Sequence, residues 1–146
     1  MKKPNKNIFY GKNVYDKREI NAVVKTLKKS TQMGYSVNLF ENKIAPLFAK
    51  KYGLMVNSGS SALILALKVL NLKKNSEVIA PCLNFGTAIS SILLSNLSPV
   101  LVDCEIETLQ IDVKKIEEKI SKKTKVLLIP NLIGNIPDWK NLRKLA

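Results

Sequence analysis

The sequence predicts an α/β fold in which a mostly parallel sheet carries helices on both faces. From residue 54 to Ala146, short apolar runs alternate with longer segments of helical periodicity. Strand–helix alternation of this kind is typical of right-handed βαβ units. The chain has 146 residues, of which 46% are hydrophobic and only 6% aromatic. This is an ordinary globular composition, long enough to bury a core.

Two helices are expected before the alternation begins. Asp16 and Glu19 form a capping-box pattern, and apolar residues follow at helical spacing, so the first helix runs over about residues 16–29. A polar turn is expected over residues 30–35. A second helix follows over residues 40–48, and Pro46 should kink or shorten it.

The later elements are expected in a regular order. Strands are expected at residues 54–57, 77–81, 99–103 and 125–130, with helices between them at about 59–70, 85–95 and 112–120. Asp112 can cap the last of these helices. A final helix starts at Pro137 and Asp138 and shows no glycine cap or other stop signal before Ala146. We therefore expect a helical segment, 1–52, and the first part of an α/β domain, 53–146, together forming the amino-terminal part of a longer protein.

Charge and hydropathy argue against two kinds of partner. The formal net charge is +13. The basic residues are almost all lysines without interleaved aromatic residues, which favours a solvated surface over a nucleic-acid interface. No apolar run approaches the roughly 18 residues that span a bilayer, and the N-terminus shows no signal peptide. We therefore expect a cytoplasmic protein that binds neither nucleic acid nor membrane.

Histidine and cysteine content restricts the chemistry further. The chain has no histidine and two cysteines. A Ser–His or Cys–His catalytic pair therefore cannot lie within these residues, and no tetrahedral zinc site is expected. Cys82 and Cys104 are expected to be small buried residues near strand ends and not a disulfide framework.

The candidate binding site is the junction at residues 54–67. A short apolar run meets the polar turn 57–61 (NSGSS) and then a long helical run. Such a junction points backbone N–H groups and hydroxyls at one place on the positive end of a helix dipole, where phosphate binds well. The turn lacks the Gly-x-Gly-x-x-Gly, P-loop and nucleophile-elbow patterns. A plain helix cap is the alternative interpretation.

A second junction strengthens the binding interpretation, because the carboxyl ends of parallel strands meet at one edge of a sheet. The strand at 77–81 is followed by residues 82–87 (CLNFGT). Phe85 would then lie near the phosphate site, suited to stack against a flat aromatic ligand; alternatively, Phe85 is a core aromatic residue. Asp103, Asn131 and residues 134–135 fall at the same edge, either beside the ligand or only as turn residues.

With these residues in place, nearly the whole chain resembles the amino-terminal portion of the DegT/StrS family. These are pyridoxal-phosphate-fold proteins that modify nucleotide-linked sugars. The resemblance is carried, in order, by residues 14–24 (VYDKREINAVV), 56–62 (VNSGSSA), 77–81 (EVIAP), 99–103 (PVLVD), 124–125 (TK) and 132–135 (LIGN). It implies an aminotransferase-type (fold type I) large domain, a small C-terminal domain, and a homodimer whose sites use both subunits.

The resemblance also implies a cofactor site. Gly59, Ser60 and Ser61 would hold the phosphate of pyridoxal 5′-phosphate (PLP) or pyridoxamine 5′-phosphate (PMP), and Phe85 would stack on its pyridine ring. The turn at 57–61 resembles that of the 3-dehydrases of lipopolysaccharide synthesis. Those enzymes act on a nucleotide-linked keto sugar, some with a reductase partner. Sugar aminotransferases of the same family are the alternative, and no metal ligand is implied.

Two positions depart from the family pattern. Asn131 stands where both branches commonly carry histidine, and Pro46 interrupts a helix that is usually free of proline. The family's catalytic lysine or histidine would lie beyond Ala146, so we expect no turnover from these residues alone. The remaining alternative is an inert truncated remnant or a basic binding module.

Overall fold

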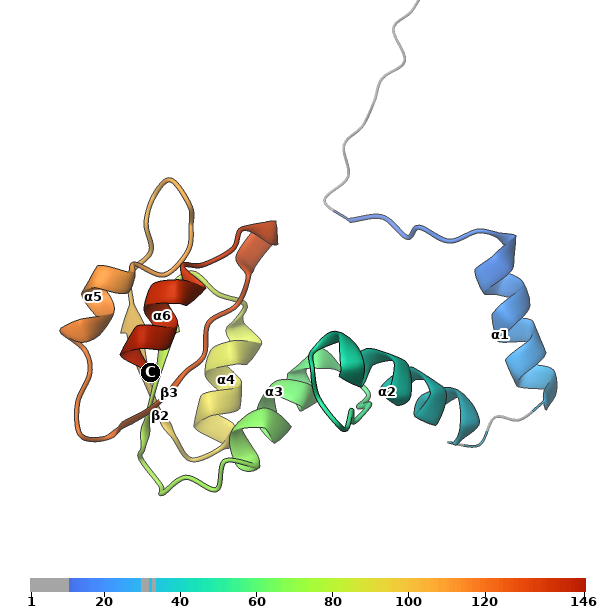
Figure 1. Cartoon of the computed structure of the whole chain (residues 1–146), viewed down its shortest axis with the longest axis horizontal. Coiled ribbons are helices and arrows are strands. Elements are labelled where there is room, and N and C mark those ends of the chain that lie inside the picture. The colour runs from blue at the N-terminus through green and yellow to red at the C-terminus, as the bar shows by residue number, and fades with distance from the viewer. Residues whose placement is uncertain (1–10, 30–31, 33) are drawn as a thin grey trace, which may run out of the picture. The chain divides into compact units, whose positions relative to one another are not determined.

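The computed structural model describes residues 11–29, 32 and 34–146 (Figure 1). The chain divides into two compact units, one ending at Met55 and the other running from Val56 to Ala146. The sequence placed this boundary after residue 52. The polar turn expected at residues 30–35 lies partly outside the described residues, and the N-terminal residues 1–10 lie wholly outside them.

The first unit contains two helices. α1 (Lys17–Lys29) begins at the expected capping box: the Asp16 N–H donates to Glu19 Oε2 at 2.8 Å, and the Arg18 N–H donates to Asp16 Oδ1 at 2.7 Å. α2 (Tyr35–Leu47) contains Pro46 in its last turn. The helix ends there, with the Phe48 N–H bonded to the Ala45 carbonyl at 3.2 Å. Proline has no N–H to donate to the preceding turn, and α2 ends one residue after Pro46. The helix begins at Tyr35, earlier than the expected residue 40, so it is not shorter than predicted.

The second unit is built on a parallel sheet, as predicted. Its strands are β1 (Glu77–Pro81), β2 (Ser98–Val102) and β3 (Thr124–Leu127), in the order β2-β1-β3. Ile79 in the central strand is level with Val100 on one side and Leu127 on the other. Both edge strands therefore run in the same direction as β1, and their carboxyl ends share one edge of the sheet.

Helices cover both faces of this sheet (Figure 1). Successive residues of a strand point to opposite faces, so Val78 and Ala80 pack beneath α3 (Gly59–Lys68) and α4 (Gly86–Leu94), in a core with Leu67 and Ile92. Ile79 points the other way, beneath α5 (Val113–Glu117) and α6 (Trp139–Leu145). β2 and β3 lie on opposite sides of β1, so right-handed crossovers require α4 and α5 on opposite faces.

The caps of the later helices agree with the sequence prediction. Asp112 precedes α5 and accepts the Lys114 N–H at 3.1 Å. Asp138 precedes α6 and accepts the Asn141 N–H at 3.1 Å. Both carboxylates satisfy a first-turn N–H that the helix itself cannot bond.

One predicted strand is absent and another is shorter. Residues 54–57 form no strand, because no other described segment forms a hydrogen-bonded ladder with them; the Met55 N–H instead donates to the Glu41 side chain at 2.7 Å. β3 ends at Leu127, and one further ladder bond joins the Leu128 N–H to the Ile79 carbonyl at 2.8 Å. Pro130 has no N–H with which to extend the ladder.

Candidate functional site

The predicted phosphate junction is the N-terminus of α3. Ser58 is the N-cap, and its Oγ accepts the Ser61 N–H at 3.2 Å and lies 3.1 Å from the Ser61 hydroxyl. The N–H groups of Gly59 and Ser60, the first two of the helix, have no hydrogen-bond acceptor within the described part of the chain. The turn is therefore a helix cap and also presents free backbone donors, so the two interpretations of the sequence are compatible.

The fold does not require glycine at position 59. Its φ is not in the left-handed region, and a Cβ built on Gly59 meets no other atom within 4 Å. Neither backbone conformation nor packing against protein therefore selects glycine here. The missing side chain leaves open space at the first residue of α3, as close approach of a ligand to the backbone requires.

These donors border a pocket of about 700 Å³. Its walls come from one side of α3, from the end of the segment that joins β1 to α4 together with the first turn of α4, and from the residues that follow β3. The lining residues are Gly59, Ser60, Ala62, Leu63, Ala66, Asn84, Phe85, Thr87, Ala88, Leu128, Ile129 and Pro130. A mostly apolar wall with a few polar groups is the usual composition of a small-molecule site.

The structure thus brings together Gly59, Ser60 and Phe85, but not Ser61. Ser61 does not line the pocket, because its N–H and hydroxyl face the Ser58 cap. Its assignment to the phosphate stays a prediction.

Phe85 is not a core residue. Its side chain is 72% exposed, and its N–H donates to Asn84 Oδ1 at 2.7 Å, immediately before α4. The interpretation of Phe85 as a core aromatic residue is therefore wrong. The exposed ring lines the same pocket as the free N–H groups of α3, where it can stack on a flat ligand.

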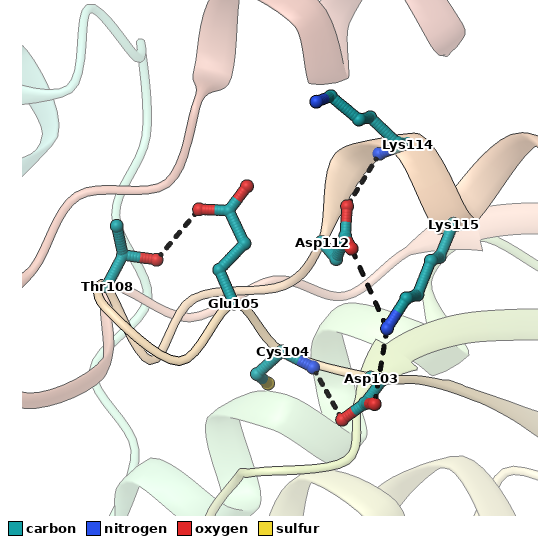
Figure 2. A network of polar contacts seen from close by, with 7 residues as sticks. All are labelled: Asp103, Cys104, Glu105, Thr108, Asp112, Lys114 and Lys115. Carbon is teal, nitrogen blue, oxygen red and sulfur yellow. Dashed lines mark hydrogen bonds and ion pairs between the residues drawn. The ribbon is translucent and has the colours of Figure 1, made fainter.

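Asp103, which follows β2, is not part of this pocket. Its carboxylate accepts the Cys104 N–H at 2.9 Å and the Lys115 ammonium at 3.3 Å, and Lys115 also lies 3.7 Å from Asp112 (Figure 2). The Cys104 N–H, and after it Lys115, holds the pKa of Asp103 below its ordinary value, and Asp103 raises the pKa of Lys115. These contacts tie the end of β2 to α5, which is a structural role.

The loop after β3 is also held by local contacts. Asn131 Oδ1 accepts the indole N–H of Trp139 at 3.2 Å, so this side chain joins the loop to α6. Asn135 donates to the Thr108 carbonyl at 2.6 Å, and Gln110 donates to the Leu132 carbonyl at 3.1 Å. Gln110 is buried and was not predicted from the sequence. A polar residue between the apolar Leu109 and Ile111 was the available signal.

The cysteines differ from each other. Cys104 is partly buried, but Cys82 is exposed because it follows the last residue of β1, beyond the covered part of the sheet. The expectation that both are buried is therefore wrong for Cys82. Within residues 11–29, 32 and 34–146, no group of three or more Cys, Asp or Glu side chains could hold a metal ion. In the same residues, no helix has both the length and the apolar character of a membrane span.

Comparison with known proteins agrees with the fold and with the resemblance. Residues 13–146 match the profile of the DegT/DnrJ/EryC1/StrS aminotransferase family, and the chain belongs to this family. It is 32% identical, over its full length and 39% of the relative, to a GDP-4-keto-6-deoxy-D-mannose 3-dehydratase of Yersinia pseudotuberculosis. The chain therefore spans about two-fifths of that relative's length.

Two solved structures have the same fold. The E. coli GDP-4-keto-6-deoxy-D-mannose-3-dehydratase with bound hydrated PLP has a TM-score of 0.86 and 31% identity, covering 92% of this chain and 36% of that one. A Streptococcus pneumoniae protein described as a sugar aminotransferase, in its PLP form, has a TM-score of 0.87 and 29% identity, covering 95% and 36%. The aminotransferase-type fold predicted from the sequence is confirmed.

Proposed function

We propose that this chain is the amino-terminal part of a PLP- or PMP-dependent enzyme that modifies a nucleotide-linked keto-deoxysugar as a 3-dehydrase. The observation that carries the proposal is the pocket itself, in which the free N–H groups of Gly59 and Ser60 and the exposed ring of Phe85 line one space. An anionic group beside a flat aromatic ring is the ligand that these donors and this ring fit.

Each part of the pocket has a role in this proposal. Gly59 and Ser60 bind the phosphate through their N–H groups, supported by the positive end of the α3 dipole. Phe85 stacks on the pyridine ring and fixes its plane. The apolar residues Leu63, Ala66 and Leu128 exclude water from the ring, which strengthens every polar contact made there. The cofactor, when bound, supplies the electron sink for the chemistry.

The first relative and the E. coli structure are both 3-dehydratases, which supports the dehydrase activity and a place in lipopolysaccharide or other surface polysaccharide synthesis. A sugar aminotransferase is the second candidate, supported by the Streptococcus pneumoniae structure at nearly equal similarity. The proposal further includes a cytoplasmic location, a homodimer, and a reductase partner for a dehydrase.

The test uses the full-length protein that contains this chain. We would incubate it with PLP, glutamate and GDP-4-keto-6-deoxymannose and identify the sugar product by mass spectrometry. A 3-dehydrase gives a product that has lost the C3 oxygen, whereas an aminotransferase gives one in which an amine replaces the C4 carbonyl oxygen. A protein that binds neither PLP nor PMP would overturn both candidates. Light scattering on the same sample reports whether it is a homodimer.

A further inference from the structure

One polar group on the pocket wall has no partner. The side-chain amide of Asn84 is oriented by its oxygen, which accepts the Phe85 N–H at 2.7 Å. The other end of the amide, Nδ2, is covered by protein atoms, and no described residue accepts its hydrogens. Buried donors without an acceptor are rare in folded proteins, because they lose their hydrogen bonds to water without replacement.

Two hydroxyls on the same pocket are also unbonded. Ser60 lies in the first turn of α3 and Thr87 in the first turn of α4, and neither hydroxyl has a hydrogen-bond partner among the described residues. Apart from the Asn84 oxygen, the polar side-chain groups on this otherwise apolar wall have no partner among the described residues, which is the pattern of a site whose partners come from a ligand.

Ser95 shows that an unpartnered atom alone does not define a site. Its Oγ is also buried without a partner, but it lies at the C-terminal end of α4 and does not line the pocket. Asn84 differs because its free donor belongs to a residue of the pocket wall, directly beside the exposed Phe85.

We propose that Asn84 and Thr87 form a second polar contact to the ligand, on the α4 wall, in addition to the phosphate contact on α3. This inference rests on the proposed function. Asn84 Nδ2 and the Thr87 hydroxyl donate to an oxygen atom of the ligand, which is either the hydroxyl of the cofactor ring or an oxygen of the sugar. Nδ2 is covered by protein atoms, so this contact forms when the Asn84 side chain turns toward the pocket that Asn84 lines.

The experiment measures binding by the full-length protein, with PMP as a probe that needs no covalent bond and GDP-mannose as a stable sugar nucleotide. Asn84→Asp keeps the acceptor for the Phe85 N–H and replaces the NH₂ group by oxygen. Thr87→Val removes only the hydroxyl at constant shape. Each variant should weaken binding of one probe about tenfold, the value of one hydrogen bond. Ser95→Ala is the matched control and should bind both probes like the wild type.

The outcomes separate the two sources of the oxygen. Weaker PMP binding assigns the contact to the cofactor, and weaker GDP-mannose binding at unchanged PMP affinity assigns it to the sugar. The inference is overturned if both variants bind both probes like the wild type, or if they lower only the melting temperature of the protein without ligand. A wild-type protein that binds neither probe would refute the proposed function as well, which distinguishes the two failures.

Discussion

Replacement of Gly59 by valine should separate ligand binding from folding. Gly59 is the first residue of α3, and a Cβ added there meets no protein atom within 4 Å. Valine is slightly better than glycine within a helix, so the free energy of unfolding should change by no more than about 0.5 kcal/mol. The added side chain fills open space at the residue that carries the first of the free α3 donors.

The expected loss of affinity follows from the hydrogen bonds that the new side chain would block. A hydrogen bond to a charged group contributes about 1.5–3 kcal/mol, so PMP should bind about ten to a hundred times more weakly. The assay is a fluorescence titration of the full-length variant with PMP, together with urea unfolding in the absence of ligand.

Gly86 supplies the matched control. It is the first residue of α4, has equally open space for a Cβ, and does not line the pocket. Gly86→Val should leave both PMP affinity and stability unchanged. Unchanged PMP affinity in Gly59→Val, or an equal loss in both variants, would refute the assignment of the phosphate to the α3 N-terminus.

Other substitutions test the ring, the core and the caps. Phe85→Ala should leave stability within about 0.5 kcal/mol because the side chain is largely exposed, and it should weaken PMP binding several-fold in the same titration. Ile92→Ala removes a fully buried side chain between α4 and the sheet and should lower the free energy of unfolding by about 2–5 kcal/mol, measured in urea. The Asn141 N–H holds the pKa of Asp138 below its ordinary value, so its cap on α6 should be intact above pH about 4 and lost as the pH falls through the lowered pKa. Asp138→Asn, which caps without titrating, should flatten this acid dependence of thermal stability, and an unchanged dependence would contradict the cap.

The sequence predicted the sheet well where one strand is buried on both faces. β1 is central, its apolar run begins after Glu77 and ends at Pro81, and its predicted limits agree with Glu77–Pro81. The run at 54–57 has a similar composition but forms no strand, because a strand exists only with a hydrogen-bonded neighbour and composition does not report one. For the same reason, β3 ends where its hydrogen bonds to β1 end, although its apolar run is longer.

The candidate site was predictable in part, because residue types at strand–helix junctions indicate where donors and aromatic rings gather. Gly59 and Ser60 were predicted from the turn, and Phe85 from its place after β1; the structure places all three on one pocket, and their contact with a cofactor stays a prediction. Asn84 was not found, since an asparagine before a helix ordinarily forms a turn or cap. Only the folded structure shows that the oxygen of its amide accepts the Phe85 N–H and that the nitrogen has no partner among the described residues.

The topology explains why the pocket lies where it does. After β1 the chain continues to α4, on the face that Val78 and Ala80 share, whereas after β3 it continues to α6, on the face of Ile79. Neighbouring strands whose connections leave toward opposite faces open a crevice at their carboxyl ends, and ligands of open α/β sheets bind in such crevices. The pocket is lined on one side by Asn84, Phe85, Thr87 and Ala88, which follow β1, and on the other side by residues 128–130, which follow β3. The strand order therefore determines where the site lies. The few polar groups of its wall that have no partner in the protein determine which ligand chemistry it fits.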